Sequence, residues 1–409
     1  MLEGELAEAA RSAVRAIVDD LDRLPPAQRR PADEALLWAY VAGAFDDEAA
    51  ASRYDEAFAA FQTWLEAPFR SLQLYGGLAG AAWVLMHIND NTEEFLQGAD
   101  RTLTDALREP WRGSHDLIVG LTGLGVYFVE RVRAGAATAR PGIARVVEQL
   151  SAMADALPDG TAWCSQPQLL PSWQRAASPS GHYDAGVAHG TPGVIALLGA
   201  VAALRDPALA PTAAQARELC DRASRWLRAR RLPPDPRGRF PGWVAPELPA
   251  PFPARTAWCY GDPGIAAAMW TTAIRTGADA TEWRELALEI AQRPAELCGV
   301  DDATLCHGAA GLAHLCNRFF QASGDERFRE AARGWFERTL AMRRPGEGIA
   351  GFTRVRGGPP GAEHQLVHEA APDFLDGAIG IALVLLAGLG GEEPGWDRMM
   401  LCDVPPGPP

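Results

Sequence analysis

The sequence predicts an all-α protein in which repeated helix pairs form a double ring, with apolar helices inside and amphipathic helices outside. Three observations support this prediction. A short Gly-x-x-Gly motif recurs along the chain, each copy precedes an almost continuously apolar run, and amphipathic, charge-bearing stretches lie between the copies. A helix that is apolar all round must be enclosed by other helices, whereas an amphipathic helix keeps one solvated face. An open solenoid is the alternative, but the apolar character of the runs favours closure.

The glycine motif occurs six times, at intervals of about 45 or about 70 residues, and the shorter interval fits one helix pair with its connections. The copies are Gly77-Leu-Ala-Gly80, Gly120-Leu-Thr-Gly123, Gly190-Thr-Pro-Gly193, Gly261-Asp-Pro-Gly264, Gly308-Ala-Ala-Gly311 and Gly377-Ala-Ile-Gly380. Residues 194–204 and 379–389 are expected to be inner helices, and residues 213–230 and 281–293 outer helices. Glycine at the entry of an inner helix allows two backbones to approach closely.

The length of 409 residues requires either two domains or one large repeat-built domain. The motifs run from about residue 74 to residue 389, so we expect one domain over residues 1–409. The formal net charge of -14 argues against a nucleic-acid partner, because such binding depends on basic side chains that neutralise phosphates.

The same sequence predicts a cytoplasmic location. The N-terminus is acidic where a secretory signal would be basic, and the longest apolar run is shorter than the ~20 residues of a membrane-spanning helix. No transmembrane segment is therefore expected, while peripheral association with a membrane stays open. Seven cysteines, an odd number in a chain without an export signal, favour reduced thiols or metal ligands over disulfides.

The residues just before the glycine motifs carry the candidate chemistry. If all inner helices run in one direction, these residues lie around one mouth of the ring. In chain order they are Asp116, His189, Cys259, Tyr260, Cys306, His307 and Asp376. A purely structural repeat would need only small residues there, so metal-binding and proton-transfer groups at equivalent positions indicate a functional site.

Cys259, Cys306 and His307 make a Cys₂His set, which suits zinc and leaves a fourth tetrahedral position open, as in catalytic zinc sites. The alternative is that these cysteines are small buried residues. Their matched positions in two repeats favour metal. The remaining cysteines lack a matched histidine and are expected to be packing or exposed thiols; they are Cys164, Cys220, Cys298, Cys316 and Cys402.

His189 occupies the same slot before its glycine as His307, and it is a candidate acid/base because imidazole titrates near neutral pH. Asp116 lies shortly before Gly120, and Arg255 shortly before Cys259; surface ion pairing is the alternative role for each. Of the histidines outside this set, His314 is expected in the packed core or behind the site residues, and the other five are expected on the surface or in loops. They are His87, His115, His182, His364 and His368.

Three segments resemble the lanthipeptide cyclases (LanC-type). They are Ala188-His-Gly-Thr-Pro-Gly193, Arg255-Thr-Ala-Trp-Cys-Tyr-Gly-Asp-Pro-Gly264 and Leu305-Cys-His-Gly-Ala-Ala-Gly311. The resemblance implies an α/α toroid of seven helix pairs, the seventh formed with the N-terminal helices. It also implies one zinc ion per chain on Cys259, Cys306 and His307, an acid/base pair of His189 and Asp116, and Arg255 and Tyr260 as further residues that line the site.

The activity implied by this resemblance is thioether formation in a class I lanthipeptide precursor. Cysteine thiols of a dehydrated precursor peptide with its leader would add to dehydroalanine or dehydrobutyrine, giving (methyl)lanthionine. His189 is the first choice to protonate the resulting enolate, with Asp116 orienting the imidazole or taking the thiol proton. No dehydratase-like segment precedes the repeats within this length, so a separate dehydratase is expected as partner.

Three other functions remain open. A LanC-like enzyme that adds glutathione to dehydrated residues would use the same zinc and the same thiol activation. A helical-barrel glycosidase needs two carboxylates, for which Asp116 and Asp376 are available, but it leaves the Cys₂His set unexplained. A non-catalytic peptide-binding scaffold has no use for intact zinc ligands.

Overall fold

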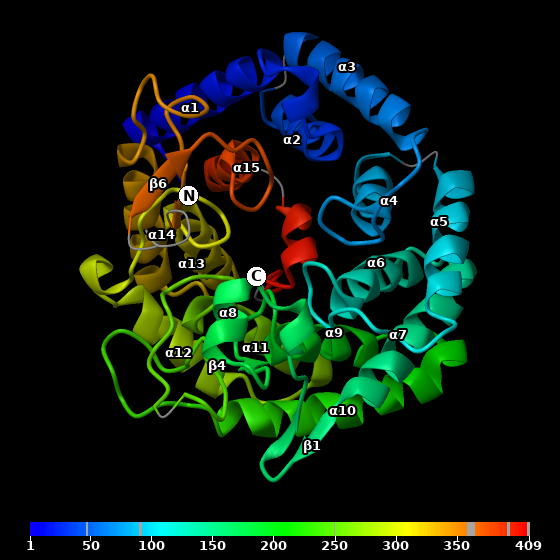
Figure 1. Cartoon of the computed structure of the whole chain (residues 1–409). Coiled ribbons are helices and arrows are strands. Elements are labelled where there is room, and N and C mark those ends of the chain that lie inside the picture. Colours follow the sequence, from blue (N-terminus) through cyan, green and yellow to red (C-terminus); the bar gives the residue numbers. More distant parts are fainter. Residues whose placement is uncertain (46–47, 90–91, 249, 358–364, 391–392, 407–409) are drawn as a thin grey trace. The chain divides into compact units, whose positions relative to one another are not determined.

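The computed structural model describes residues 1–45, 48–89, 92–248, 250–357, 365–390 and 393–406 (Figure 1). These residues are mostly helical, with three small two-stranded antiparallel sheets. They form two compact units. Unit 1 contains Met1–Pro68 and Ala291–Pro394, and unit 2 contains Phe69–Ile290 and Gly395–Pro405.

Unit 1 is built around α15, whose side chains are buried from Ala378 to Gly388. This helix contacts α1, α2 and α13, while α14 packs on α13 and α3 packs on α2. The elements of unit 1 are α1 (Gly4–Asp22), α2 (Pro31–Phe45), α3 (Glu48–Leu65), α13 (Ala309–Ser323), α14 (Glu326–Ala341), β5 (Arg354–Gly357), β6 (Leu366–Glu369) and α15 (Ala378–Leu389).

Unit 2 is built around α9, which contacts α6, α10 and α11. The helices of unit 2 are α4 (Leu78–Ile88), α5 (Glu93–Ala106), α6 (Leu121–Arg133), α7 (Arg140–Met153), α8 (Ser172–Ala177), α9 (Thr191–Ala202), α10 (Ala210–Arg228), α11 (Asp262–Thr276) and α12 (Thr281–Ala291). Its strands are β1 (Asp155–Leu157), β2 (Gly160–Ala162), β3 (Tyr183–Asp184) and β4 (Trp243–Val244). A C-terminal 3₁₀ helix (Gly395–Met400) is held by the indole of Trp258, which donates to the Met400 carbonyl at 3.0 Å.

The expected alternation of buried and amphipathic helices is confirmed. The helices after the six glycine motifs are α4, α6, α9, α11, α13 and α15, and their first turns are buried on all sides. The amphipathic stretches predicted at residues 213–230 and 281–293 are α10 and α12. The seventh pair is α2 with α3, as expected for the N-terminal segment; α2 has no glycine motif and begins at Pro31.

The glycine motif has one structural cause in all six copies. A β-carbon on the first glycine would overlap the carbonyl oxygen of the residue six positions earlier, and a β-carbon on the second glycine would overlap the carbonyl oxygen six positions before it. The loop before each helix therefore folds back tightly onto the helix entry, as Gly190 against Asp184 and Gly193 against Val187 illustrate. Because the fold-back repeats, residues at the same distance before the motif occupy equivalent places.

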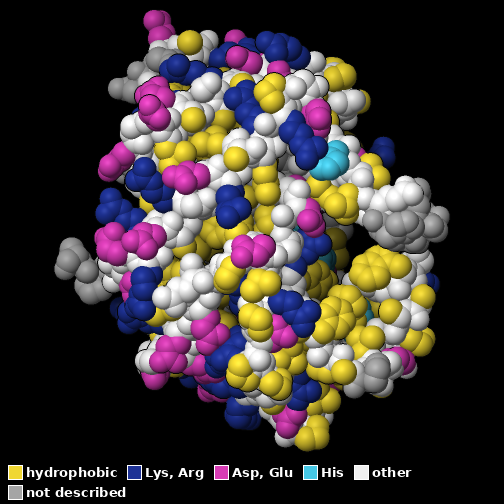
Figure 2. All heavy atoms as spheres, turned by 90° about the vertical axis from the view of Figure 1, so that its left-hand side faces the viewer, with side chains coloured by type: hydrophobic (Ala, Val, Ile, Leu, Met, Phe, Trp, Pro, Cys, Tyr) yellow, Lys and Arg dark blue, Asp and Glu magenta, His cyan; other side chains and the backbone are white. Residues whose placement is uncertain are grey.

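Within the described part of the chain, no helix is long and apolar enough to cross a membrane. Acidic and basic side chains are interspersed over the face drawn in Figure 2. The surplus of acids gives the net charge of -14.

Candidate functional site

Asp116 and His189 meet in unit 2, each on the loop that leads into a buried helix. His189 Nδ1 lies 2.8 Å from Asp116 Oδ2, and the backbone N–H of Val119 donates to Asp116 Oδ1 at 2.8 Å. The two loops are also joined by the backbone, because Leu117 N–H donates to the Ala188 carbonyl at 3.1 Å. The Asp116 side chain is 7% exposed, while that of His189 is 39% exposed. One partner is thus fixed and the other is accessible.

The electrostatics of this pair favour a charged imidazole. Burial by itself lowers the pKa of His189, but the hydrogen bond with Asp116 and the negative charges of Asp116 and Asp184 together outweigh it and raise the pKa above the usual value. Burial by itself raises the pKa of Asp116, but the hydrogen bond and charge of His189, together with the hydrogen bond from Val119 N–H, outweigh it and lower the pKa. The contact between the two residues contributes to both shifts. Asp116 is therefore suited to hold a proton on Nδ1, which leaves Nε2 as the nitrogen for proton exchange.

Cys259 and Tyr260 lie on the loop before α11, beside this pair. Ala188 N–H donates to the Cys259 carbonyl at 3.3 Å, and the Cys259 side chain is buried. The rings of Tyr260 and His189 are stacked, with centroids 5.8 Å apart. Burial, together with the nearby negative charge of Asp184, raises the pKa of Tyr260 well above its usual value, so the hydroxyl keeps its proton.

Arg255 has a different place from the other predicted site residues of unit 2. The residue is exposed, and its backbone carbonyl is the one that Gly261 packs against. The backbone of Arg255 therefore shapes the loop that carries Cys259 and Tyr260.

In unit 1, Cys306 and His307 lie on the loop before α13, and both are half-buried. Cys306 N–H donates to the Leu375 carbonyl at 2.9 Å, which ties this loop to the one before α15. The two ring nitrogens of His307 each have a carboxylate nearby. Nε2 lies 3.5 Å from Asp302 Oδ2, and Nδ1 lies 3.7 Å from Asp376 Oδ1.

Asp302 is the firmly held member of this group. Its Oδ1 accepts hydrogen bonds from Thr304 N at 3.0 Å and Thr304 Oγ1 at 2.7 Å, and its Oδ2 accepts one from Val355 N at 2.9 Å. Burial raises its pKa, but the hydrogen bonds, with that of His307 first, outweigh burial and lower it. Asp302 therefore stays ionised and can orient the His307 ring.

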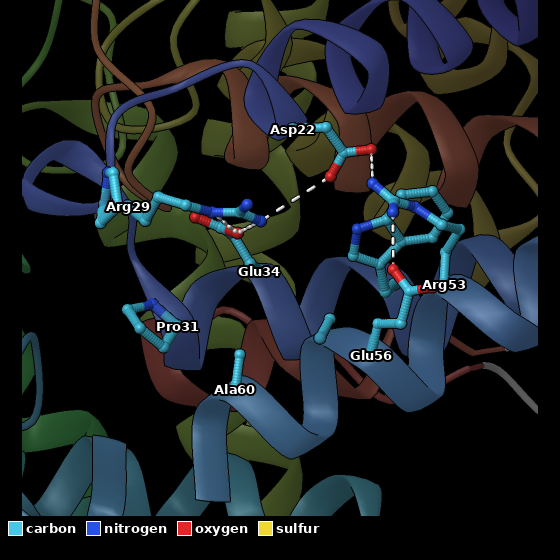
Figure 3. Close-up of a pocket in the computed structure, with 10 residues that line it drawn as sticks. Asp22, Arg29, Pro31, Glu34, Arg53, Glu56 and Ala60 are labelled. Carbon is cyan, nitrogen blue, oxygen red and sulfur yellow. Dashed lines mark hydrogen bonds and ion pairs between the residues drawn. The ribbon is translucent and has the colours of Figure 1, made fainter. Parts of the chain in front are cut away.

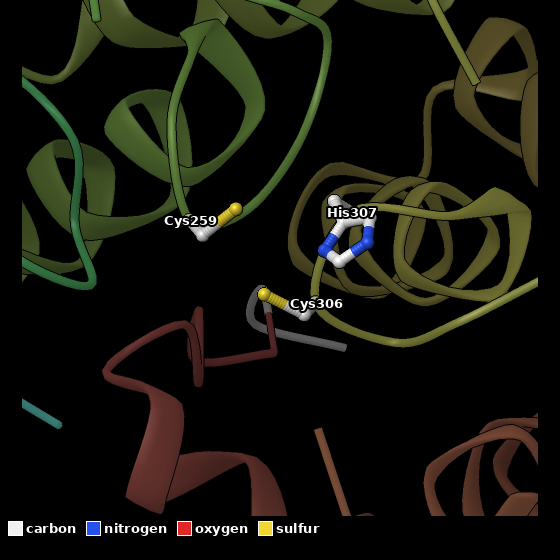
Figure 4. A group of neighbouring side chains, drawn as sticks. All are labelled: Cys259, Cys306 and His307. Carbon is white, nitrogen blue, oxygen red and sulfur yellow. The ribbon is translucent and has the colours of Figure 1, made fainter. Parts of the chain in front are cut away.

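Cys259, Cys306 and His307 are a candidate set of metal ligands (Figure 4). Cys259 is on the loop that leads into α11 of unit 2, and Cys306 and His307 share the loop that leads into α13 of unit 1. Two thiols and an imidazole are the donors that zinc prefers. A carboxylate beside the ring of a ligating histidine is the usual arrangement around such metals, and Asp302 supplies one. The residues present therefore fit a zinc ion.

The sequence interpretation missed the burial of four residues. Asp184 and Asp302 both stand six positions before a first glycine, so aligning the repeats could have singled them out. His182 and His115, expected on the surface or in loops, are buried in loops or beside a short strand, and His182 Nε2 lies 3.1 Å from Asp184 Oδ2. His364, placed in the same expected group, lies outside the described residues.

A pocket of about 370 Å³ lies between α1, α2 and α3 of unit 1 (Figure 3). Its arginines are paired with its acids. Arg29 pairs with Glu34 and lies 3.7 Å from Asp22, while Arg53 pairs with Asp22 and, at 2.6 Å, with Glu56. Because these charges satisfy one another, we interpret the cluster as structural.

Comparison with known proteins identifies the family. No curated protein sequence matches the chain. Its fold is similar to that of nisin cyclase, with a TM-score of 0.71 and 16% sequence identity over 96% of this chain and 97% of that chain. This likeness confirms the all-α, α/α-toroid fold. A family model described as "Lanthionine synthetase C-like protein" matches residues 34–401. The chain therefore belongs to the lanthionine synthetase C-like family.

Proposed function

We propose that this protein is a zinc-dependent cyclase that adds cysteine thiols of a dehydrated precursor peptide to dehydroalanine or dehydrobutyrine in the same peptide. The observation that carries the proposal is the Asp116–His189 hydrogen bond beside Cys259 and Tyr260, in a chain of the lanthionine synthetase C-like family. Such a pair can deliver a proton to a carbanion, which is what addition to a dehydrated residue requires.

In this proposed enzyme, residues 1–409 form one domain, and Cys259 of unit 2 and Cys306 and His307 of unit 1 are the ligands of one zinc ion. The donor types, their equivalent loop positions and the carboxylate beside His307 support it. When bound, zinc would supply a positive charge that makes a coordinated substrate thiol a thiolate near neutral pH.

The residues of unit 2 would then complete the addition. The sulfur forms a bond to the β-carbon, the electron pair of the double bond moves toward the α-carbon and its carbonyl oxygen, and His189 Nε2 gives a proton to the α-carbon. The proton lost by the thiol balances the one delivered. Asp116 uses both oxygens, one on His189 and one on Val119, so it orients the imidazole and stabilises its charged form.

Tyr260 is suited to the oxygen on which negative charge develops. Burial raises the pKa of Tyr260 and keeps the phenolic proton available for donation. A donor placed at a developing oxyanion stabilises the transition state more than the ground state. A separate dehydratase would provide the dehydrated peptide.

The test combines zinc analysis with ring closure. Wild type, Cys306→Ala and Cys164→Ala are expressed with ample zinc, and a dehydrated, cysteine-containing peptide is then treated with each, alkylated and weighed by mass spectrometry. Cys164 is the matched control because it is also a half-buried free thiol. Wild type and Cys164→Ala should carry about one zinc per chain and remove the alkylatable thiol without a mass change.

Cys306→Ala should lose both zinc and ring closure. Negligible zinc in wild type, or full zinc in Cys306→Ala, would contradict the metal assignment. If the peptide gains the mass of one glutathione when glutathione is added, the protein is the glutathione-adding enzyme and the cyclase assignment is wrong.

A further inference from the structure

Four aromatic rings of unit 2 form a continuous row that ends at His189. The ring centroids of Trp173 and Trp243 are 6.1 Å apart, those of Trp243 and Tyr260 6.4 Å, and those of Tyr260 and His189 5.8 Å. The first two contacts are edge-on, and the third is stacked. These centroid distances are typical of favourable aromatic pairs, so the four rings contact one another along the row.

The row is held by elements that are far apart in sequence. Trp243 is on β4, which pairs with β3 in the register Asp184↔Trp243, and Ala185 N–H donates to the Gly242 carbonyl at 2.9 Å. The His182 ring lies 5.6 Å from Trp243 on that side. Trp173 is on α8, and its neighbour Gln174 is buried.

The outer end of the row is open to solvent. Trp173 is 58% exposed, Trp243 and Tyr260 are partly exposed, and Leu169, just before α8, is also exposed. Tryptophan is enriched at binding hot spots, where its large ring supplies apolar contact area.

We infer that the row of Trp173, Trp243 and Tyr260 is a substrate subsite that binds an apolar side chain of the peptide next to the residue that accepts the thiol. This inference rests on the proposed function. The peptide substrate is the expected occupant, because the row is continuous with His189, whose ring would protonate the reacting carbon. A group lying on the row is therefore within a few residues of the reacting atoms along the same peptide. The subsite would favour peptides with an aliphatic or aromatic neighbour.

The test uses Trp173→Ala, Trp173→Phe and the control Phe252→Ala. Phe252 is 65% exposed and lies outside the row. Two dehydrated peptides are compared, identical except for Leu or Ser beside the dehydrated residue. For the Leu peptide, Trp173→Ala should raise KM about tenfold with kcat little changed, because the contact is the same in ground and transition states. Trp173→Phe should restore most of the loss, and Phe252→Ala should have no effect.

Binding of both peptides to His189→Ala, with and without Trp173→Ala, separates the subsite from the chemistry. A selective loss of Leu-peptide binding in the double variant supports the subsite even if the wild type does not close the ring. If Trp173→Ala weakens binding of both peptides equally, or weakens neither, the subsite inference is wrong. If Trp173→Ala leaves both peptides unaffected but weakens binding of the purified dehydratase, Trp173 belongs to a protein interface instead.

Discussion

Replacing Asp116 by Asn tests whether this carboxylate activates His189. The change is nearly isosteric, and the amide oxygen can still accept the Val119 N–H, which Asp116 Oδ1 accepts at 2.8 Å. The loop should therefore keep its shape. The 2.8 Å contact with His189 Nδ1 changes, because an amide N–H₂ facing that nitrogen makes it an acceptor and no longer favours the charged imidazole.

The size of the effect follows from the burial of the contact. With Asp116 only 7% exposed, its bond to His189 is a charge-assisted hydrogen bond that is largely shielded from water. Such a bond contributes about 1.5–3 kcal/mol. At about 1.4 kcal/mol per factor of ten, ring closure by Asp116→Asn should be roughly 10- to 150-fold slower than in wild type. His189→Ala removes the acid itself and should be slower still, by ~10²–10⁴-fold in total.

The pH profile gives an independent reading of the same substitution. A general acid must be protonated, so activity falls as the pH rises through its pKa. Asp116 raises the pKa of His189, and Asp116→Asn should therefore move the alkaline limb of the profile to lower pH. Single-turnover rates from about pH 5 to pH 9 measure this shift, and zinc content should equal that of wild type. An unmoved limb together with a rate within about twofold of wild type would refute the role of the pair.

Two further predictions concern unit 1. Asp302→Ala should weaken zinc binding about 10- to 100-fold in a chelator competition, because the His307 ring loses the carboxylate that orients it. The control Asp301→Ala, at the exposed neighbouring carboxylate, should leave zinc affinity unchanged. Equal zinc affinities of the two variants would exclude Asp302 as a positioning residue. Burial and repulsion from Asp373 raise the pKa of Asp33 to about 7. Between about pH 4 and pH 7 the folded state therefore binds more protons than the unfolded state, so the folded state loses stability as the pH rises through this range. Asp33→Asn should therefore raise the melting temperature above pH 7 and leave it unchanged near pH 4, and a pH-independent difference would contradict this.

Helix pairing was predictable because its signal is local and repeated. Residues 194–204 and 379–389 agree with α9 and α15 since a run that is apolar all round can only be enclosed. The short sheets were not predictable. β3 and β4 have two residues each and are separated by α9 and α10, so neither strand has an alternating pattern and their pairing is non-local.

The candidate site was predictable where position alone decides it. Their places before the glycines made His189 and Asp116 separate candidates, and the resemblance to the lanthipeptide cyclases paired them; the fold-back of each loop is the reason that such places lie close together. Asp302 was missed because Asp301-Asp302 has the composition of a solvated loop. Its role depends on Val355 of β5, more than 50 residues away, whose N–H it accepts. The aromatic row was missed for the same reason, since its members come from α8, β4 and the loop before α11.

Besides the contacts of Asp116 and Tyr260 with His189, peptide groups join the loops of unit 2, with Leu117 N–H on the Ala188 carbonyl and Ala188 N–H on the Cys259 carbonyl. These backbone hydrogen bonds do not depend on which side chain each residue carries. A side chain at one of these places can therefore be exchanged while the backbone links between the loops remain, provided that the glycines remain. Val119 and Asp376 stand where His189 and His307 stand in their own repeats. A single substitution at Val119 is then enough to present a new proton donor or ligand from a scaffold that is already in place, so this architecture offers a direct route to new chemistry in the laboratory and in nature.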